Sequence, residues 1–199
     1  LDTKKVRQVT DGSTWYSTGG GFDYAWSPDG KWFTLEFIGN KHDPYSDIGL
    51  VNAQGGDIIN ITNSGYTSGS PRWVLDGNAI LFITERYGMR NHASWGSLND
   101  VMLVFLNQDA YDKFRLSKED YELQKELEKE QDKTKEDESK KDKQKDKDKK
   151  EDTKEEKVKD IVVELKNMED RIVRLTPNSS NLSSAIISKD GESLYYFAA

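Results

Sequence analysis

The sequence Ala25-Trp26-Ser27-Pro28-Asp29-Gly30-Lys31-Trp32-Phe33-Thr34-Leu35-Glu36-Phe37 carries an Asp-Gly pair between two apolar runs. Glycine supplies the positive φ that a tight turn requires, and aspartate can hydrogen-bond its own backbone there, so the pair favours a β-hairpin. Two further copies of the pattern occur at residues 72–83 (RWVLDGNAILFI) and 187–197 (ISKDGESLYYF). The sequence therefore predicts three hairpins built to one plan.

A short β-branched segment that ends in threonine precedes each hairpin. The last two threonines, Thr62 and Thr176, each lie 12 residues before the first residue of the following turn. Regular spacing of this kind indicates a structural repeat. The three segments are Val6–Thr10, Ile58–Thr62 and Ile172–Thr176.

A further strand is expected between each hairpin and the next threonine segment. In the first repeat it covers residues 47–51, whereas in the second repeat residues 100–105 and 160–165 both qualify. One unit thus has about four strands in roughly 45 residues, which is the size of a β-propeller blade. The predicted fold class is all-β, a partial β-propeller of four-stranded antiparallel blades with a long charged insertion in one blade.

The insertion accounts for the unusual charge of the chain. Residues 128–157 contain 12 lysines and 13 acidic residues and no aliphatic or aromatic residue, so they are expected to form a solvated tether. Residues 117–130 are expected to be helical, because a Ser-x-x-Asp cap precedes loosely periodic leucines. The resulting division is 1–106 for the first blades, 107–159 for the insertion, and 160–199 for the rest of the second blade and the next hairpin.

The composition excludes several classes of function. The net charge of −7 and the near balance of lysines and acids in the insertion leave no basic face for nucleic acid. No segment approaches the length of apolar sequence that spans a bilayer. There is no cysteine, and the two histidines, His42 and His92, are 50 residues apart, so we expect no metal and no cofactor.

The amino terminus begins Leu1-Asp2-Thr3, without an initiator methionine or a signal-peptide core, which suggests an internal fragment or a processed product. About half a propeller ring is present. The remaining blades would come from a longer protein or from partners, and exposed apolar edges would also favour self-association as a homo-oligomer.

No catalytic motif is recognisable, so the candidate site is a binding site. Loops at propeller faces commonly carry binding residues, and arginine with aromatic side chains is typical of interaction hot spots. The alternative is a well-packed loop without a ligand. Trp26, Trp32 and Trp73 are instead assigned to packing between blades. The candidate ligand-binding residues, all in the loop after the second hairpin, are Arg86, Tyr87, Arg90, His92 and Trp95.

The Ser27-Pro28-Asp29-Gly30-Lys31 turn and its copies resemble the propeller repeats of Tol-system-like and tricorn-like proteins. The second unit more specifically resembles the interrupted blade of bacterial tricorn-type serine peptidases. That resemblance rests on residues 81–88 (LFITERYG), 100–105 leading into 110–114 (AYDKF), the Lys/Glu-rich insert, and 169–176 (EDRIVRLT).

The resemblance implies a large serine peptidase whose amino-terminal propellers precede a PDZ-like domain and a catalytic domain. Propellers of this family are thought to filter or guide peptides toward the active site. The chain would then be a non-catalytic propeller segment whose partners are peptides or unfolded polypeptide and the rest of the parent protein. An exported, periplasmic location in a bacterium is expected, with the cytoplasm as the alternative. A Tol-system-like binding propeller, or blades of a prolyl-oligopeptidase or lyase-type enzyme, are the competing interpretations.

Overall fold

The structure is a computed structural model that describes residues 5–12, 23–39, 45–90, 96–127, 130 and 159–199. The chain divides into two compact units, residues 1–110 together with 159–199, and residues 111–158. The first unit is built almost entirely from antiparallel β-strands. No described helix is long and apolar enough to cross a membrane.

The first sheet is a four-stranded antiparallel meander in the order β1-β2-β3-β4. In its register Trp26 pairs with Phe33, and Phe33 in turn pairs with Val51. Consecutive strands are therefore neighbours throughout, as short connections favour. The strands are β1 (Tyr24–Trp26), β2 (Trp32–Phe37), β3 (Asp47–Asn52) and β4 (Ile59–Asn60).

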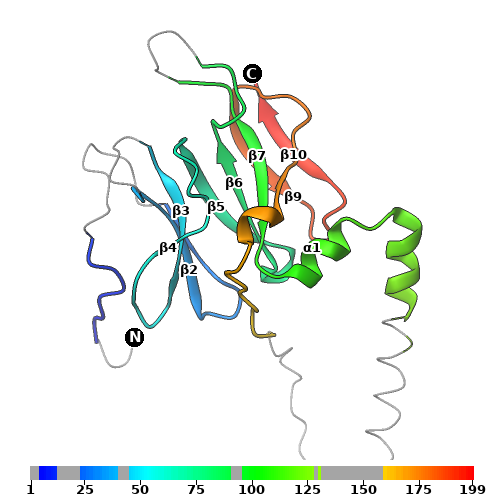
Figure 1. The fold of residues 1–199 in the computed structure, drawn as a ribbon, viewed down its shortest axis with the longest axis horizontal. Helices are drawn as coiled ribbons and strands as arrows, with labels where there is room; N and C mark the ends of the chain where they lie inside the picture. The colour runs from blue at the N-terminus through cyan, green and yellow to red at the C-terminus, as the bar shows by residue number, and fades with distance from the viewer. Residues whose placement is uncertain (1–4, 13–22, 40–44, 91–95, 128–129, 131–158) are drawn as a thin grey trace, which may run out of the picture. The chain divides into compact units, whose positions relative to one another are not determined.

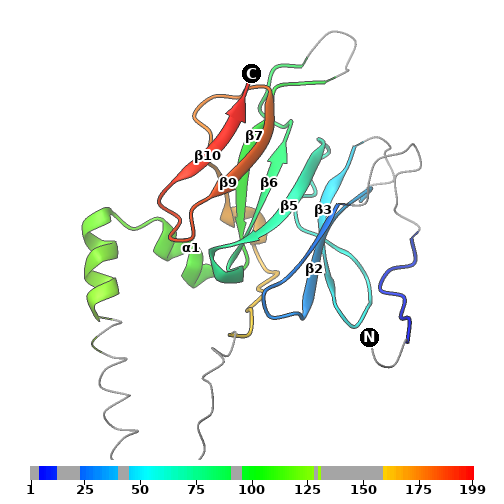
Figure 2. The same cartoon turned by 180° about the vertical axis from the view of Figure 1, so that it is seen from behind.

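The second sheet repeats the same plan in the order β5-β6-β7-β8, and a two-stranded β9-β10 sheet begins it again. Figures 1 and 2 show the β5–β8 sheet between the β1–β4 sheet and the β9–β10 hairpin. The described strands do not close into a ring. Their bounds are β5 (Ser68–Val74), β6 (Ala79–Thr84), β7 (Asp100–Phe105), β8 (Ile172–Arg174), β9 (Leu182–Ile187) and β10 (Leu194–Ala198).

The structure thus confirms an all-β fold with three hairpins at the predicted positions. It also decides the alternative left open for the second unit, because residues 100–105 form β7 and residues 160–165 form no strand. The prediction of a strand at Val6–Thr10 is wrong for this structure. That segment lies against the turn after β3, where the Arg7 guanidinium donates to the Ala53 carbonyl at 2.6 Å.

The turn between β1 and β2 is organised by two side chains. The Ser27 hydroxyl donates to Asp29 Oδ1 at 2.6 Å and accepts the Trp32 N–H at 2.9 Å. In the turn between β9 and β10, the Ser188 hydroxyl likewise donates to Asp190 Oδ1 and accepts the Ser193 N–H at 2.9 Å. Serine and aspartate at matching positions therefore make the same hydrogen bonds in the β1–β2 turn and in the β9–β10 turn.

The turn between β5 and β6 differs because Val74 replaces the serine. It contains a short 3₁₀ turn, η1 (Leu75–Gly77), in which Leu75 and Asp76 adopt positive φ values of 52° and 54°. Such φ values are unfavourable for a bulky side chain such as leucine. The Asp-Gly pair thus predicts that a turn forms, whereas the preceding serine decides its geometry.

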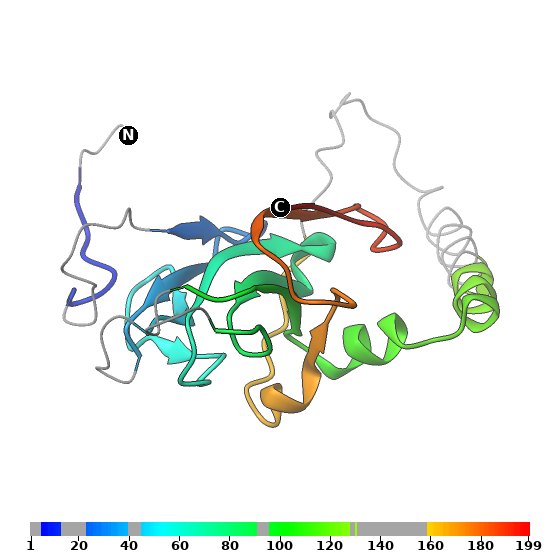
Figure 3. The same cartoon turned by 90° about the horizontal axis from the view of Figure 1, so that it is seen from above.

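The main apolar core lies between the first and second sheets. Ile48 and Leu50 from β3 form one cluster with Ile80 from β6 and Val104 from β7, and all four are fully buried. Figure 3 shows the two sheets side by side, seen from above. Burial of apolar surface is the main favourable contribution to packing, so this shared core holds the two sheets together.

Tryptophans reinforce this contact as the sequence predicted, with one exception. Trp32 and Trp73 pack against the shared core, and the Trp73 indole N–H also donates to the Ala25 carbonyl of β1 at 3.0 Å. Trp26 is 55% exposed and stacks on Phe33, with ring centroids 3.8 Å apart. Trp73 therefore links β5 to β1, the first strands of the two sheets.

Both ends of the insertion are fastened at the end of the sheets where the hairpin turns lie. The Glu164 N–H donates to the Leu106 carbonyl at 2.7 Å, and the Gln108 N–H donates to the Glu164 carboxylate at 2.9 Å. Ile161 packs against the core, and its N–H donates to Asp29 Oδ2 at 3.0 Å. Residues 160–165 were one of the two strand candidates in the sequence. In the structure they instead cross the ends of both sheets, and we call this segment the strap.

Arg171 holds the strap from inside, in the short 3₁₀ helix η3 (Met168–Arg171). Its side chain is 2% exposed and donates to the carbonyls of Phe105, Glu164 and Lys166. A buried guanidinium needs acceptors for its donors, and backbone carbonyls supply them here.

The second unit is described only in part. Helix α1 (Gln108–Phe114) leads into it, and residues 118–127 are helical as predicted. The predicted cap is present, because Ser117 Oγ accepts the Asp120 N–H at 3.1 Å. Most of the charged tether predicted at residues 128–157 lies outside the described residues.

The Trp73 contact generates a stability prediction. Trp73→Phe removes the indole donor and leaves the Ala25 carbonyl without it, so it should lower the free energy of unfolding by about 1 kcal/mol more than Trp32→Phe does. Trp32 is the matched control, since it packs on the same core but its indole makes no hydrogen bond among the described residues. Urea unfolding of both variants measures the difference, and equal losses would contradict the linking role of Trp73.

Candidate functional site

The candidate loop between β6 and β7 begins as a tightly paired stem. The Leu98 N–H donates to the Met89 carbonyl at 3.0 Å, and Arg90 pairs with Ser97 in an antiparallel bridge. A Cβ on Gly88 would lie 1.7 Å from the Leu98 carbonyl oxygen, so only glycine permits this approach. The base of the loop is therefore held in place by backbone contacts.

Three of the five predicted site residues lie on this stem. Arg86 and Arg90 are exposed and Tyr87 is half-exposed. The Arg86 guanidinium lies 5.6 Å from the centroid of the Tyr87 ring, and the Arg90 guanidinium lies 5.2 Å from that of Tyr66. Among the described residues no carboxylate forms an ion pair with either arginine, so both cations can receive an anionic group.

The other two predicted residues, His92 and Trp95, lie outside the described residues. Their part in the site stays a prediction. The structure brings together Arg86 and Tyr87, and it places Arg90 farther along the same stem, beside Tyr66 from the connection between β4 and β5.

A small cavity of about 20 Å³ opens where this loop meets the border between the two sheets. That volume is enough for one water molecule or a comparably small group. Phe82 and Met102 contribute apolar surface. The polar groups around it are those of Thr62, Ser64, Ser68, Thr84, Arg86 and Tyr87.

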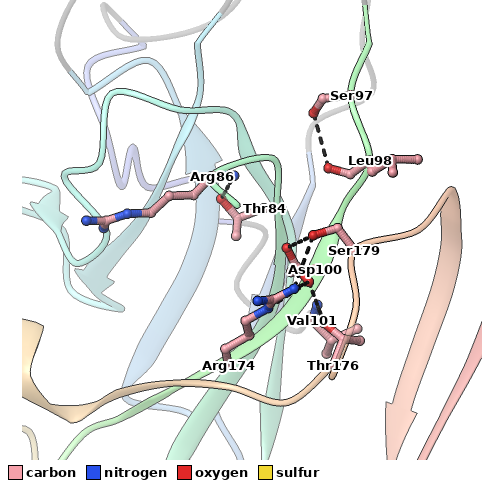
Figure 4. Close-up of polar contacts among 9 residues, drawn as sticks. All are labelled: Thr84, Arg86, Ser97, Leu98, Asp100, Val101, Arg174, Thr176 and Ser179. Carbon is pink, nitrogen blue, oxygen red and sulfur yellow. Dashed lines mark hydrogen bonds and ion pairs between the residues drawn. The ribbon is translucent and has the colours of Figure 1, made fainter. Parts of the chain in front are cut away.

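A buried carboxylate lies close to this loop and was not predicted. Asp100, at the start of β7, is completely buried and accepts hydrogen bonds from the Thr176 and Ser179 hydroxyls, both at 2.7 Å. Arg174 forms an ion pair with it, with Nη2 2.8 Å from Oδ1. Figure 4 shows these three side chains converging on Asp100, whereas Arg86 points away from it.

Arg174 connects this network to the candidate loop. Its guanidinium lies 5.4 Å from the centroid of the Tyr87 ring, within the range of a cation–π contact. Neither Asp100 nor Arg174 was among the predicted site residues. The available signal was the repeat itself, because Asp-Val-Met-Leu-Val at 100–104 matches Asp-Ile-Gly-Leu-Val at 47–51.

A partly buried acid, Glu36 on β2, lies at the border between the sheets, beside Gly69 of β5. Burial raises the pKa of its carboxyl and the charge of Asp23 adds to this, while hydrogen bonds from the Ser46 hydroxyl and the Ser70 amide act in the opposite direction. A Cβ on Gly69 would lie 2.7 Å from Glu36 Oε2, so glycine there makes room for the carboxylate. Strand β5 is bulged at this point.

The described side chains suit binding better than proton transfer. Guanidinium groups hold carboxylates through charge-assisted hydrogen bonds, and tyrosine rings provide apolar contact surface. In the part of the chain that the structure describes, no group of three His, Cys, Asp or Glu side chains is placed to hold a metal ion. The expectation of no cofactor stays a prediction.

Comparison with known proteins links the chain to a peptidase. A segment of 59 residues, 30% of the chain, is 34% identical to the Bacillus subtilis (strain 168) protein described as uncharacterized peptidase YuxL. The chain spans only 9% of the length of that protein. No family model and no solved structure matches the chain.

The burial of Glu36 generates a prediction about pH. Because its folded pKa is raised, the folded state binds the Glu36 proton more tightly than the unfolded state does. The stability that this proton provides is full below the unfolded pKa and is lost as pH rises through the folded pKa. Glu36→Gln keeps an amide in place of the carboxylate and removes this loss.

We therefore expect Glu36→Gln to gain stability relative to wild type as pH rises from 4 to 7, measured by urea unfolding at each pH. Glu169→Gln, which makes the same substitution at an exposed carboxylate, is the control. A Glu36→Gln variant that loses stability relative to wild type over this range would contradict the assignment.

Proposed function

We propose that the chain is a non-catalytic β-propeller segment of a tricorn-like serine peptidase, which guides or gates peptides on their way to a catalytic domain elsewhere in the protein. The observation that carries the proposal is the repetition of one four-stranded meander, packed face to face with its copy and then begun a third time. Blades of a propeller have this strand order and this packing.

The peptidase part of the proposal rests on two sequence similarities. One is the resemblance of the interrupted second unit to tricorn-type peptidases. The other is the 59-residue similarity to a protein named as a peptidase. Both concern the family of the parent protein, so its PDZ-like and catalytic domains, its peptide substrates and its partners are part of the proposal.

The peptide-binding part rests on the loop after β6. Arg86 and Arg90 are exposed cations beside tyrosine rings, on a stem held by backbone pairing. A peptide carboxylate would bind the guanidinium groups, and an apolar side chain would pack on the aromatic rings. Such a site changes peptide affinity without touching the chemical step.

The location and assembly of the protein belong to the same proposal. We propose an exported, periplasmic protein, which cell fractionation would test against the cytoplasmic alternative. The remaining blades would be supplied by the parent chain, and self-association is the alternative way to cover the exposed Tyr195 and Phe197 of β10.

A Tol-system-like propeller that binds a protein or ligand is the second candidate function. The exposed aromatic and cationic loop fits it equally well, because arginine and tyrosine are common at protein interfaces. Blades of a prolyl-oligopeptidase or lyase-type enzyme are the third. The sequence of the parent gene after Ala199 separates the three, since it would encode a PDZ-like and peptidase region, no catalytic domain, or a hydrolase with a Gly-x-Ser-x-Gly motif.

Peptide hydrolysis and labelling by a serine-directed active-site probe, measured on this chain and on its full-length parent, test the proposal. We expect the parent to hydrolyse peptides and take up the label, and this chain to do neither. A parent that neither hydrolyses peptides nor takes up the label would overturn the peptidase proposal and favour the binding propeller.

The loop generates a kinetic prediction for the parent protein. Alanine at Arg86, Arg90, His92 or Trp95 should raise KM for peptides, by about tenfold at the arginines because a charge-assisted hydrogen bond is lost, and leave kcat unchanged. Arg72→Ala, at an exposed arginine on β5, is the matched control. Unchanged kinetics in all four variants would remove the loop from the mechanism.

A further inference from the structure

The buried Asp100 network is one of two copies of the same arrangement. In the first sheet, Asp47 at the start of β3 accepts the Thr62 hydroxyl at 2.8 Å, and the Ile48 N–H donates to that hydroxyl at 3.0 Å. In the second sheet, the Thr176 hydroxyl donates to Asp100 and accepts the N–H of Val101. We refer to each Asp–Thr pair, with its neighbour two residues before the threonine, as a clasp.

The two clasps differ at that neighbouring position. In the first sheet it is Asn60, whose amide nitrogen donates to Asp47 Oδ2 at 2.9 Å and whose amide oxygen accepts the Thr62 and Asn63 N–H groups. In the second sheet it is Arg174, whose Nε donates to Asp100 Oδ1 at 2.9 Å. The arginine side chain is longer, and its guanidinium extends to the ring of Tyr87.

The first clasp shows which side chains are enough to satisfy the buried aspartate. The buried Asp47 carboxylate accepts hydrogen bonds from the Asn60 amide, the Thr62 hydroxyl and the Ser64 N–H, so a neutral side chain fills the position two residues before the threonine in this clasp. Arg174 differs from Asn60 by its positive charge, by its hydrogen bond to the Ser179 hydroxyl, and by its contact with Tyr87 on the stem of the candidate loop. We propose that Arg174 is a positioning residue of the ligand site, which fixes the Tyr87 ring beside Arg86 so that the two side chains receive a carboxylate-bearing ligand.

The geometry explains how the effect would be transmitted. Asp100 is completely buried and holds Arg174 through an ion pair, while the Arg174 side chain itself is 35% exposed. A guanidinium fixed on a buried anchor presents its face to Tyr87 with little freedom of movement. Tyr87 in turn borders the small cavity together with Arg86. Arg174 thus acts on the site through the tyrosine ring.

The ligand class in this inference rests on the proposed function, because the carboxylate is that of a peptide. The positioning role does not, since it concerns only the contact between Arg174 and Tyr87. The test therefore needs one measurement without ligand and one with it.

Arg174→Asn is the deciding variant, because it converts the second clasp into the first. The full chain of the variant should unfold at the same urea concentration as wild type. Hydrogen exchange of the backbone amides at residues 86–90, measured by mass spectrometry, should accelerate about two- to fivefold, which corresponds to the loss of an exposed cation–π contact. Arg72→Asn, which removes an exposed arginine from β5, should leave this exchange unchanged.

Calorimetric titration provides the measurement with ligand. The probe is an acetylated pentapeptide with a free carboxyl terminus, compared with the same peptide as its carboxyl-terminal amide. Wild type should bind the free acid more tightly than the amide, and Arg174→Asn should bind the free acid about two- to fivefold more weakly than wild type does. Arg174→Lys keeps the cation without the planar fork and should recover part of the loss.

Each outcome decides one part of the inference. An Arg174→Asn variant that unfolds far more easily than wild type would show that the guanidinium is structural and overturn the positioning role. Unchanged exchange at residues 86–90 would also overturn it. Accelerated exchange in a chain that binds neither peptide would support the positioning role and overturn the proposed carboxylate ligand at this loop.

Discussion

The apolar contact between the first and second sheets is the constraint on which the rest of the structure depends. Each sheet is apolar on the face that meets the other, with Ile48 and Leu50 on one side and Ile80 and Val104 on the other. Neither set has water contact, so neither sheet is stable with that face uncovered. The Trp73 hydrogen bond to Ala25 joins the first strands of the two sheets, β5 and β1, in the same arrangement.

The two ends of the packed strands carry different features. At one end lie the hairpin turns and the strap, where Ile161 and Arg171 fasten the returning chain of the insertion. At the other end lie the β6–β7 loop and the two clasps, where charged and hydroxyl groups gather around a small cavity. The insertion and the candidate ligand site are therefore attached to opposite ends of the strands, and changes in one need not disturb the other.

The hairpins could be predicted because their signals are local. An Asp-Gly pair between apolar runs determines a turn within a few residues, and Ser27 and Ser188 even predict equal turn geometry. The choice of residues 100–105 over 160–165 as the third strand could not be predicted. Both segments are apolar, and only the burial of Arg171 among backbone carbonyls shows that the later one is a strap.

The candidate residues of the loop could be proposed from the sequence for the same reason. Exposed arginines and tyrosines in a long loop are visible there, so Arg86, Tyr87 and Arg90 were named as candidates, and their role in binding stays a prediction. Asp100 and Arg174 are 74 residues apart and come together only through the pairing of β7 with β8. A charged side chain that is satisfied inside the fold leaves no local pattern, although comparison of the two repeats identifies its position.

We propose that the sheets are consecutive blades of one ring within a larger peptidase. An experimental structure of the full-length protein tests this proposal. A further antiparallel strand should then pair with β10, and another sheet should cover Tyr24 and Trp26 on the open face of the first sheet, as the first sheet covers the second. A structure in which β10 stays an edge strand and both side chains face solvent would contradict it.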